Sequence, residues 1–145
     1  MTEQVLELSI EQFDPEPNVP EPVLVKSELV CYLIYSDREG ERKALKFLSC
    51  SLAKFGYPND EGLGGHPLYS KGLSFYGCFE VINSEWIEEL RQNNKTVYPD
   101  REIFAGFRHF IFSFHDSTFE CIAKGVELVD KYPQVDNSAM KVYGI

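Results

Sequence analysis

An aromatic-rich stretch over residues 107–121 constrains the fold of this chain more than any other feature. Within it, three phenylalanines alternate with three other residues, which places the two sets on opposite faces of an extended strand: Phe110, Phe112 and Phe114 against His109, Ile111 and Ser113. Asp116 and Ser117 suit a two-residue turn, because short polar side chains favour tight turns. Residues 118–124 are suited to a return strand, so the stretch predicts a β-hairpin.

Three more strands and one helix are predicted from the patterns elsewhere. Apolar alternation predicts a strand over residues 4–10, with Leu6, Leu8 and Ile10 on one face, and apolar runs predict strands over 29–35 and 73–82. Asn83 and Ser84 cap a helix expected at about 84–93, whose first turn is rich in glutamate. Its apolar side chains predict a buried face: Trp86, Ile87 and Leu90.

Residues 43–55 allow two interpretations. The spacing of the apolar residues fits a helix that Gly56 would cap. The Ser-Cys-Ser sequence at residues 49–51 is poor helix material, and the polar turn at 36–42 also fits a hairpin. The strand interpretation is slightly favoured.

These elements predict one α+β domain over residues 1–145. We expect a mainly antiparallel sheet of about five or six strands, with the helix packed on one face. Two segments are expected to lie at the periphery: a proline-rich arm at 11–28 and a tail at 129–145. The loop at 56–72 is longer than most connections, and such loops are often functional.

Charge and cysteine usage narrow the partners and the compartment. The formal net charge of −9 disfavours nucleic acid as a ligand, since phosphate backbones are bound by clustered Lys and Arg. It allows another protein or a cationic small ligand as the partner. The four cysteines form no Cys-x-x-Cys pair, and the sequence shows neither a signal peptide nor a membrane span. A reduced, cytoplasmic protein is therefore expected.

Four short stretches together resemble a group of small uncharacterised bacterial proteins. They contain Pro58-Asn-Asp-Glu61, Gly65-His-Pro-Leu-Tyr69, Phe79-Glu-Val-Ile-Asn-Ser-Glu-Trp86 and Phe112-Ser-Phe-His-Asp-Ser-Thr-Phe-Glu-Cys121. The resemblance covers roughly residues 45–125. It implies no activity, cofactor or catalytic residue, and it favours the strand interpretation of residues 43–55.

The loop and the hairpin contain the side chains best suited to chemistry. The candidate catalytic residues are Asp60 and His66 from the loop, and His115, Asp116 and Glu120 from the hairpin. A histidine oriented by a carboxylate is a common general base near neutral pH. Turn formation alone also explains Asp60 and Asp116. The sequence contains no metal-binding or nucleotide-binding motif, so we expect no cofactor and no metal.

Two functions remain open at this point. The slightly preferred one is a small acidic, non-enzymatic binding or protein-interaction module. The alternative is a small enzyme, most simply a hydrolase, that uses a polar cluster formed by the 56–72 loop and the 115–120 hairpin. A concave pocket that joins His66, Asp60, His115 and Glu120 would favour the enzyme. An exposed apolar patch would favour the binding module.

Overall fold

Two antiparallel sheets and one helix make up the computed structural model, which describes residues 2–135. The first sheet has five strands, in the order β1 (Gln4–Glu7), β6 (Gly77–Ile82), β7 (Arg108–Ser113), β8 (Thr118–Ala123) and β5 (Leu52–Gly56). The second has four, in the order β2 (Val23–Lys26), β3 (Cys31–Ser36), β4 (Arg42–Leu48) and β9 (Gly125–Val129). The predicted α+β class, mainly antiparallel, is confirmed.

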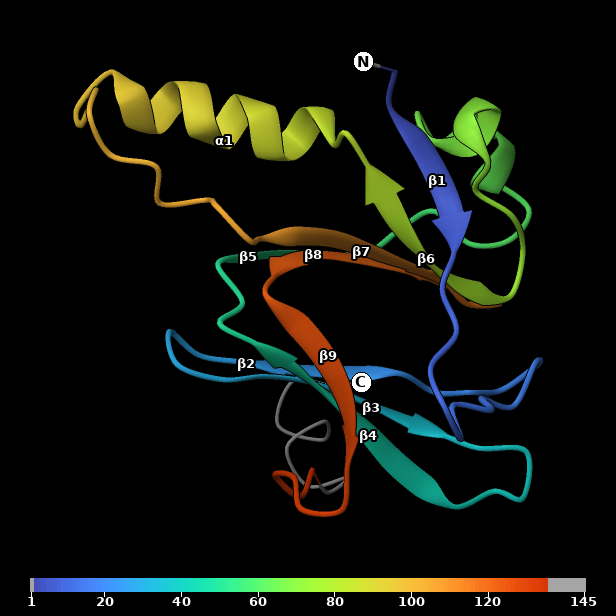
Figure 1. Cartoon of the computed structure of the whole chain (residues 1–145). Coiled ribbons are helices and arrows are strands. Elements are labelled where there is room, and N and C mark those ends of the chain that lie inside the picture. The colour runs from blue at the N-terminus through green and yellow to red at the C-terminus, as the bar shows by residue number, and fades with distance from the viewer. Residues whose placement is uncertain (1, 136–145) are drawn as a thin grey trace, which may run out of the picture.

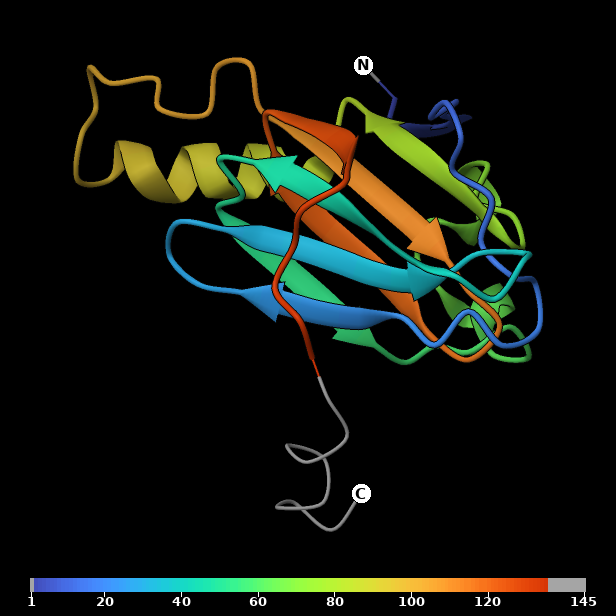
Figure 2. The same ribbon diagram turned by 90° about the horizontal axis from the view of Figure 1, so that it is seen from below.

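The strands form two sheets rather than the single sheet that the sequence predicted. Figure 1 shows them as two layers, and Figure 2 shows the four-stranded sheet from below. β4 continues into β5, and β8 into β9, so both strand pairs pass from one sheet to the other. Backbone hydrogen bonds continue around this corner, from Lys124 N to Leu48 O (2.7 Å) and from Ser51 N to Ile122 O (2.9 Å). The strand interpretation of residues 43–55 is confirmed, and its Ser-Cys-Ser interruption is the bend.

Phenylalanine side chains fill the space between the two sheets. Phe110, Phe112 and Phe119 are 0% exposed and pack around Phe47, with ring centroids 5.2–6.0 Å apart. The predicted hairpin and the alternation of its faces are therefore confirmed. Its turn is centred one residue earlier than predicted, because Phe114 N donates to Ser117 O (2.8 Å) across His115 and Asp116.

A second apolar cluster lies on the outer face of the five-stranded sheet, beneath the long loop. The loop forms two short 3-10 turns, η1 (Leu63–Gly65) and η2 (Tyr69–Lys71). Its leucines Leu63 and Leu68, and Leu73 just after it, are buried with Val5, Phe79, Val81 and Ile111. Gly72 brings the loop against β1, because a Cβ there would lie 2.5 Å from Val5 O and its φ is +121°. Val5 faces this cluster and Leu6 is 49% exposed, so the apolar face predicted for the first strand is wrong at Leu6.

The predicted helix is present as α1 (Glu85–Lys95) and extends two residues further than expected. The Ser84 hydroxyl caps it by accepting a hydrogen bond from Ile87 N (3.2 Å). Trp86, Ile87 and Leu90 are only partly buried, so the fully buried face that we predicted is wrong. Figure 1 explains this: one end of α1 lies over the sheet and the rest extends past its edge.

The arm and the start of the tail contact the sandwich at specific points. Phe13 packs edge-on against Tyr35 and Phe112, at centroid distances of 5.0 and 5.6 Å. The sequence did not indicate β2, an edge strand within the 11–28 segment, or β9. In the predicted tail, the Tyr132 hydroxyl donates to Arg42 O (3.0 Å), and residues 136–145 lie outside the described part of the chain. Among the described residues, α1 is too short and too polar to span a membrane.

Candidate functional site

A chain of side-chain hydrogen bonds lies between the five-stranded sheet and the layer that covers it. Glu120, on β8, contacts two histidines: His66 Nε2 lies 2.9 Å from its Oε2, and His109 Nε2 lies 2.8 Å from its Oε1. The other ring nitrogen of His109 is 2.7 Å from the Ser84 hydroxyl. The chain therefore links the loop, two strands and the start of α1.

The surrounding bonds determine where the protons lie in this chain. Leu68 N donates to His66 Nδ1 (3.0 Å), so a neutral His66 carries its proton on Nε2 and donates it to Glu120. The ionised carboxylate also accepts from His109 Nε2–H. His109 Nδ1 then accepts the hydroxyl proton of Ser84, while Ser84 Oγ accepts from the helix amide of Ile87. Every polar atom of this path has a partner.

Glu120 is an ionised carboxylate in a buried position. Its residue exposure is 8%, and burial alone would raise the pKa of the carboxyl. Burial is the largest single influence, but the hydrogen bonds from His109 and His66, together with the electrostatic attraction of the two histidines, outweigh it and bring this pKa down to about 2. Trp86 stands edge-on over His109, with centroids 5.2 Å apart, and covers that end of the chain.

A second polar cluster lies at the tip of the hairpin. Asp60 N donates to His115 O (2.9 Å), and the carboxylate of Asp60 accepts from the Tyr76 hydroxyl (2.6 Å). His115 Nδ1 lies 2.9 Å from Asp116 Oδ1, and its Nε2 lies 3.6 Å from Asp60 Oδ2. The bond to Asp116 and the negative charges of Asp60, Asp116 and Glu61 raise the pKa of His115, although desolvation opposes them. This cluster therefore stabilises the protonated imidazole.

The five predicted site residues are divided between these two clusters. His66 and Glu120 meet on the outer face of the sheet, while Asp60, His115 and Asp116 meet at the hairpin tip. Loop and hairpin do contact each other, as the combined site required. Among residues 2–135, however, no side-chain hydrogen bond or ion pair connects one cluster with the other.

His109 and Ser84 belong to the first cluster, and sequence analysis did not select them as site residues. A signal for His109 was present. If the hairpin turn is placed at residues 115 and 116, Ile111 pairs with Glu120 across the two strands. His109 lies two residues before Ile111 and is therefore on the same face of the sheet as Glu120. No local signal indicated that the helix cap at Ser84 would contact a histidine 25 residues away.

A cavity of about 510 Å³ opens at the end of the sandwich, beside the hairpin tip. The arm forms one wall, and His115 and Tyr76 belong to the opposite one. Its apolar surface comes from five residues that also contact or form the core or its margins: Leu8, Ile10, Phe13, Cys78 and Phe114. Three carboxylates line it, from Glu7, Asp14 and Glu16, against one guanidinium from Arg38.

Among the described residues, three buried side-chain oxygens lack a hydrogen-bond partner: Asp14 Oδ1, the Tyr35 hydroxyl and Ser117 Oγ. Of these three residues, Asp14 lines the cavity. Lys43 forms ion pairs with two of the carboxylates in this region. Its ammonium lies 3.6 Å from Asp14 Oδ1 and 2.9 Å from Asp37 Oδ2. Burial, and then the negative charges of Asp14 and Asp37, raises the pKa of Tyr35. With three carboxylates against one guanidinium, the cavity wall has a negative potential.

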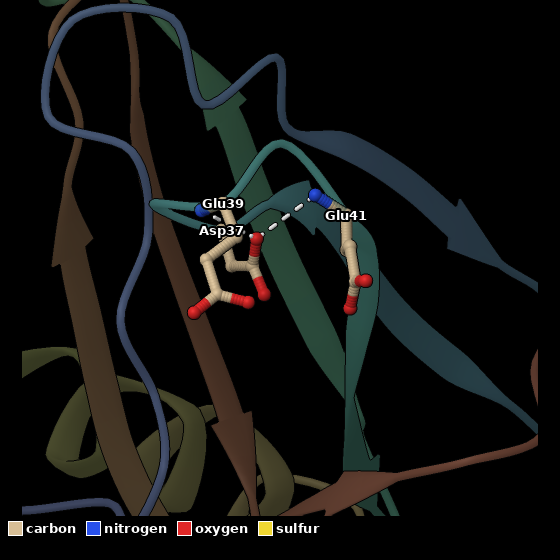
Figure 3. A group of neighbouring side chains, drawn as sticks. All are labelled: Asp37, Glu39 and Glu41. Carbon is tan, nitrogen blue, oxygen red and sulfur yellow. Dashed lines mark hydrogen bonds between the residues drawn. The ribbon is translucent and has the colours of Figure 1, made fainter.

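Three carboxylates in the turn before β4 also lie within 4.8 Å of one another, from Asp37, Glu39 and Glu41. Figure 3 shows the Asp37 carboxylate directed at the backbone amides of both glutamates, and each of these bonds is 2.9 Å long. The other Asp37 oxygen binds Lys43, and this bond is the main reason that the pKa of Asp37 is lowered. The two glutamates are exposed, so this group is explained as a turn motif.

Comparison with known proteins adds no relative: no family model, curated protein or solved structure matches this chain.

Proposed function

We propose that this protein is a non-enzymatic binding module that captures a cationic group in the cavity at the end of the sandwich. The observation that carries the proposal is the charge of the cavity wall, where three carboxylates, from Glu7, Asp14 and Glu16, face a single guanidinium, from Arg38. This excess of negative charge favours a cationic ligand over an anionic one.

The shape and the charge of the cavity support a small cationic ligand. Its volume of about 510 Å³ is typical of small-ligand sites, and its walls combine aromatic rings with carboxylates. Carboxylates attract the ammonium or guanidinium group, and the ring faces of Phe13 and Tyr76 add cation–π attraction. The net charge of −9 steers cations towards the molecule.

An exposed row of aromatic rings extends from the cavity mouth and supports a peptide as the source of the cation. Tyr69, Phe75 and Tyr76 contact one another in sequence, with centroids 6.1 Å apart at each step, and Tyr76 stacks on His115 at 6.3 Å. The three aromatic side chains are 39–52% exposed. Aromatic residues are enriched in protein interfaces, so this row is suited to the apolar side chains that flank a Lys or Arg.

The test is a magnetic-resonance titration of the labelled protein with probes of opposite charge. Arginine methyl ester, cadaverine and a short blocked peptide centred on arginine are the cationic probes, and acetate is the anionic control. We expect the cationic probes to shift the amide signals of residues 76–78 and 114–115, with dissociation constants of roughly 10 μM to 1 mM that rise with salt. A free amine that binds as tightly as the peptide would identify a small molecule as the ligand.

Asp14→Asn is the decisive variant, since it removes one of the three carboxylate charges of the cavity wall. It should weaken the binding of cations at least about tenfold, equivalent to 1.4 kcal/mol. Glu89→Gln, on the exposed face of α1, is the matched control and should bind like the original protein. Binding of acetate in preference to the cations, or unchanged affinity in Asp14→Asn, would refute the proposal.

A hydrolase is the second candidate, and the Ser84–His109–Glu120 chain favours it. In this chain a hydroxyl, an imidazole and a carboxylate follow one another, in the order of a nucleophile, a base and an orienting group. Ser84 Oγ lies 2.7 Å from His109 Nδ1, and His109 Nε2 lies 2.8 Å from Glu120 Oε1. Ser84 lies between a strand and a helix and lines a cavity of about 510 Å³. It ranks second because Glu3 Oε2 already accepts from Glu85 N (2.7 Å), one of the amides at this helix end that an oxyanion would need.

Hydrolysis of p-nitrophenyl acetate tests this second candidate. A serine hydrolase should release p-nitrophenol with an initial burst, and Ser84→Ala and His109→Gln should both abolish the burst. Mass spectrometry after treatment with a sulfonyl fluoride should locate the label on Ser84. Turnover that persists in Ser84→Ala would exclude this serine as the nucleophile.

A further inference from the structure

Three of the four cysteines lie together at the corner where the chain passes from one sheet to the other. Cys31 begins β3, Cys121 lies on β8, and Cys50 lies in the bend between β4 and β5. Cys31 and Cys121 are 0% exposed and belong to the core between the sheets, and Cys50 packs against that core from its margin. Cys50 is therefore a partly exposed residue that packs against the core cluster to which the two buried cysteines belong.

Cys50 lines an open hollow on the surface of this corner. Lys26, Ser49, Ser51 and Phe107 line the same hollow, whose volume is about 770 Å³. The Lys26 ammonium donates to the backbone oxygen of Cys50 (3.2 Å), which holds a positive charge beside the thiol. The Cys50 thiol itself donates to Leu52 O at 3.4 Å. The hollow is large enough to admit a small polar oxidant beside Cys50.

The three thiols differ in their tendency to ionise. The neighbouring thiols of Cys121 and Cys31, together with the charge of Lys26, hold the pKa of Cys50 below that of an ordinary thiol. The neighbouring Cys50 and burial raise the pKa of Cys31, and burial is the first cause that raises the pKa of Cys121. Among these three cysteines, ionisation is therefore favoured at Cys50, the one that is partly exposed, and ease of ionisation is a condition for a reactive cysteine.

We propose that Cys50 is a site of oxidation by hydroperoxides, and that its oxidised form closes a disulfide with one of the two buried thiols behind it. Accessibility, a neighbouring cation and an adjacent resolving thiol are the three properties that such cysteines share. Cys78 serves as the comparison. It is buried, at 6% exposure, and its thiol donates to Leu8 O (3.0 Å).

The chemistry balances in two steps with hydrogen peroxide as the oxidant. The Cys50 thiolate attacks one peroxide oxygen, the O–O bond breaks, and sulfenic acid and hydroxide form. The thiol of Cys31 or Cys121 then attacks the sulfenic sulfur, the S–O bond breaks, and water leaves with the thiol proton. The hydroxide of the first step takes up the proton that the Cys50 thiol lost on ionisation, so in total two thiols lose two electrons and one peroxide is reduced to two waters.

Peroxide treatment of the full chain tests the proposal, followed by alkylation of free thiols and peptide mass spectrometry. We expect Cys50 to be lost at least about tenfold faster than Cys78, since the thiolate is the reacting form. The product should be a disulfide from Cys50 to Cys31 or Cys121. Cys50→Ser should leave all remaining thiols unoxidised at that peroxide dose, and Cys78→Ser should react like the original protein.

Two further measurements test the sulfenic acid step and the effect of the substitution on folding. In the Cys31→Ser, Cys121→Ser double variant, dimedone should trap the sulfenic acid on Cys50. The Cys50→Ser variant should unfold at the same urea concentration as the original protein, which separates a chemical effect from a folding defect. Equal oxidation of Cys50 and Cys78, or conversion of Cys50 to sulfinic acid in the original protein without a disulfide, would overturn the proposal.

Discussion

His115 is the histidine whose surroundings favour its protonated form. The hydrogen bond to Asp116 and the charges of Asp60 and Glu61 raise its pKa above the ordinary 6.5. Because folding raises this pKa, the protonated form of His115 stabilises the folded state. This contribution is fully present below pH 6.5 and is lost as the pH rises through the higher pKa of His115 in the folded protein. A proton titration by magnetic resonance should give a value above 6.5 for His115, and Asp116→Asn should lower it. A value at or below 6.5 would show that desolvation outweighs the carboxylates.

Glu120 is the residue with the largest expected effect on stability. Replacement by Gln leaves the Nε2–H groups of His66 and His109 with a single amide oxygen, so Glu120→Gln should destabilise the fold by roughly 3 kcal/mol at neutral pH. The pKa of the carboxyl is lowered from 4.5 to about 2, so its contribution is present above pH 4.5 and declines as the pH falls towards 2.

Urea unfolding of both proteins at neutral pH and at successively lower pH values checks this prediction. The difference between Glu120→Gln and the original protein should narrow as the pH falls from 4.5 towards 2. Glu127→Gln, an exposed substitution on β9, is the control and should change stability by less than about 0.5 kcal/mol. A difference that stays constant with pH would mean that the carboxylate charge is not what stabilises this site.

At the scale of elements, the long loop is a cover for the sheet and not a free segment. Leu63 is 1% exposed and belongs to the outer apolar cluster, so Leu63→Ala should cost about 2–4 kcal/mol through the cavity that it leaves. Leu29, at 90% exposure, is the control, and Leu29→Ala should have little effect. Urea unfolding measures both. If Leu63→Ala left global stability unchanged while the loop became sensitive to proteolysis, the loop would open independently of the core.

The elements that sequence analysis identified correctly are those with local signals. The hairpin at 107–124 carries an alternating aromatic pattern, and α1 carries a cap and an acidic first turn. β2 has only four residues, and β9 follows β8 after a single residue, so neither has boundaries that a local pattern can reveal. The buried face predicted for α1 failed for a related reason: its apolar spacing is helical, but its position over the sheet edge leaves those side chains half-buried.

At the scale of the whole molecule, the division into two sheets follows from a bend that only long-range pairing defines. Ser49 has a φ of +52°, and the sequence shows this position only as an interruption between two apolar runs. The candidate site behaves similarly. Polar clusters do contain the five residues that we selected: Asp60, His66, His115, Asp116 and Glu120. Their division between the outer face and the hairpin tip depends on how the loop folds over the sheet, which no local pattern indicates.

The charge of the whole chain leads to a prediction about nucleic acid. With a net charge of −9, the protein should not retard single- or double-stranded DNA in a mobility-shift measurement, even at low salt where electrostatic binding is strongest. A polycationic peptide of similar length, tested in parallel, is the positive control. Retardation by this protein that disappears with added salt would reveal a basic face that the overall charge conceals.

The two sheets should unfold as one cooperative unit, because β4–β5 and β8–β9 each continue from one sheet into the other and share the same aromatic core. The single tryptophan, Trp86, provides a local probe, since it lies over His109 on the outer face, with Lys54 4.1 Å from its ring. Far-ultraviolet circular dichroism reports mainly on the strands of both sheets. In urea, tryptophan fluorescence and circular dichroism should therefore change at the same midpoint, as a two-state transition requires.

An earlier fluorescence transition would contradict this prediction. It would mean that α1 and the layer containing Trp86 detach while the sandwich remains folded. Because the Ser84–His109–Glu120–His66 chain ties that layer to the sheet, the Glu120→Gln variant is the protein in which such a separation should first be seen. Coincident transitions in the original protein and separated ones in Glu120→Gln would identify this buried chain as the link that makes unfolding cooperative.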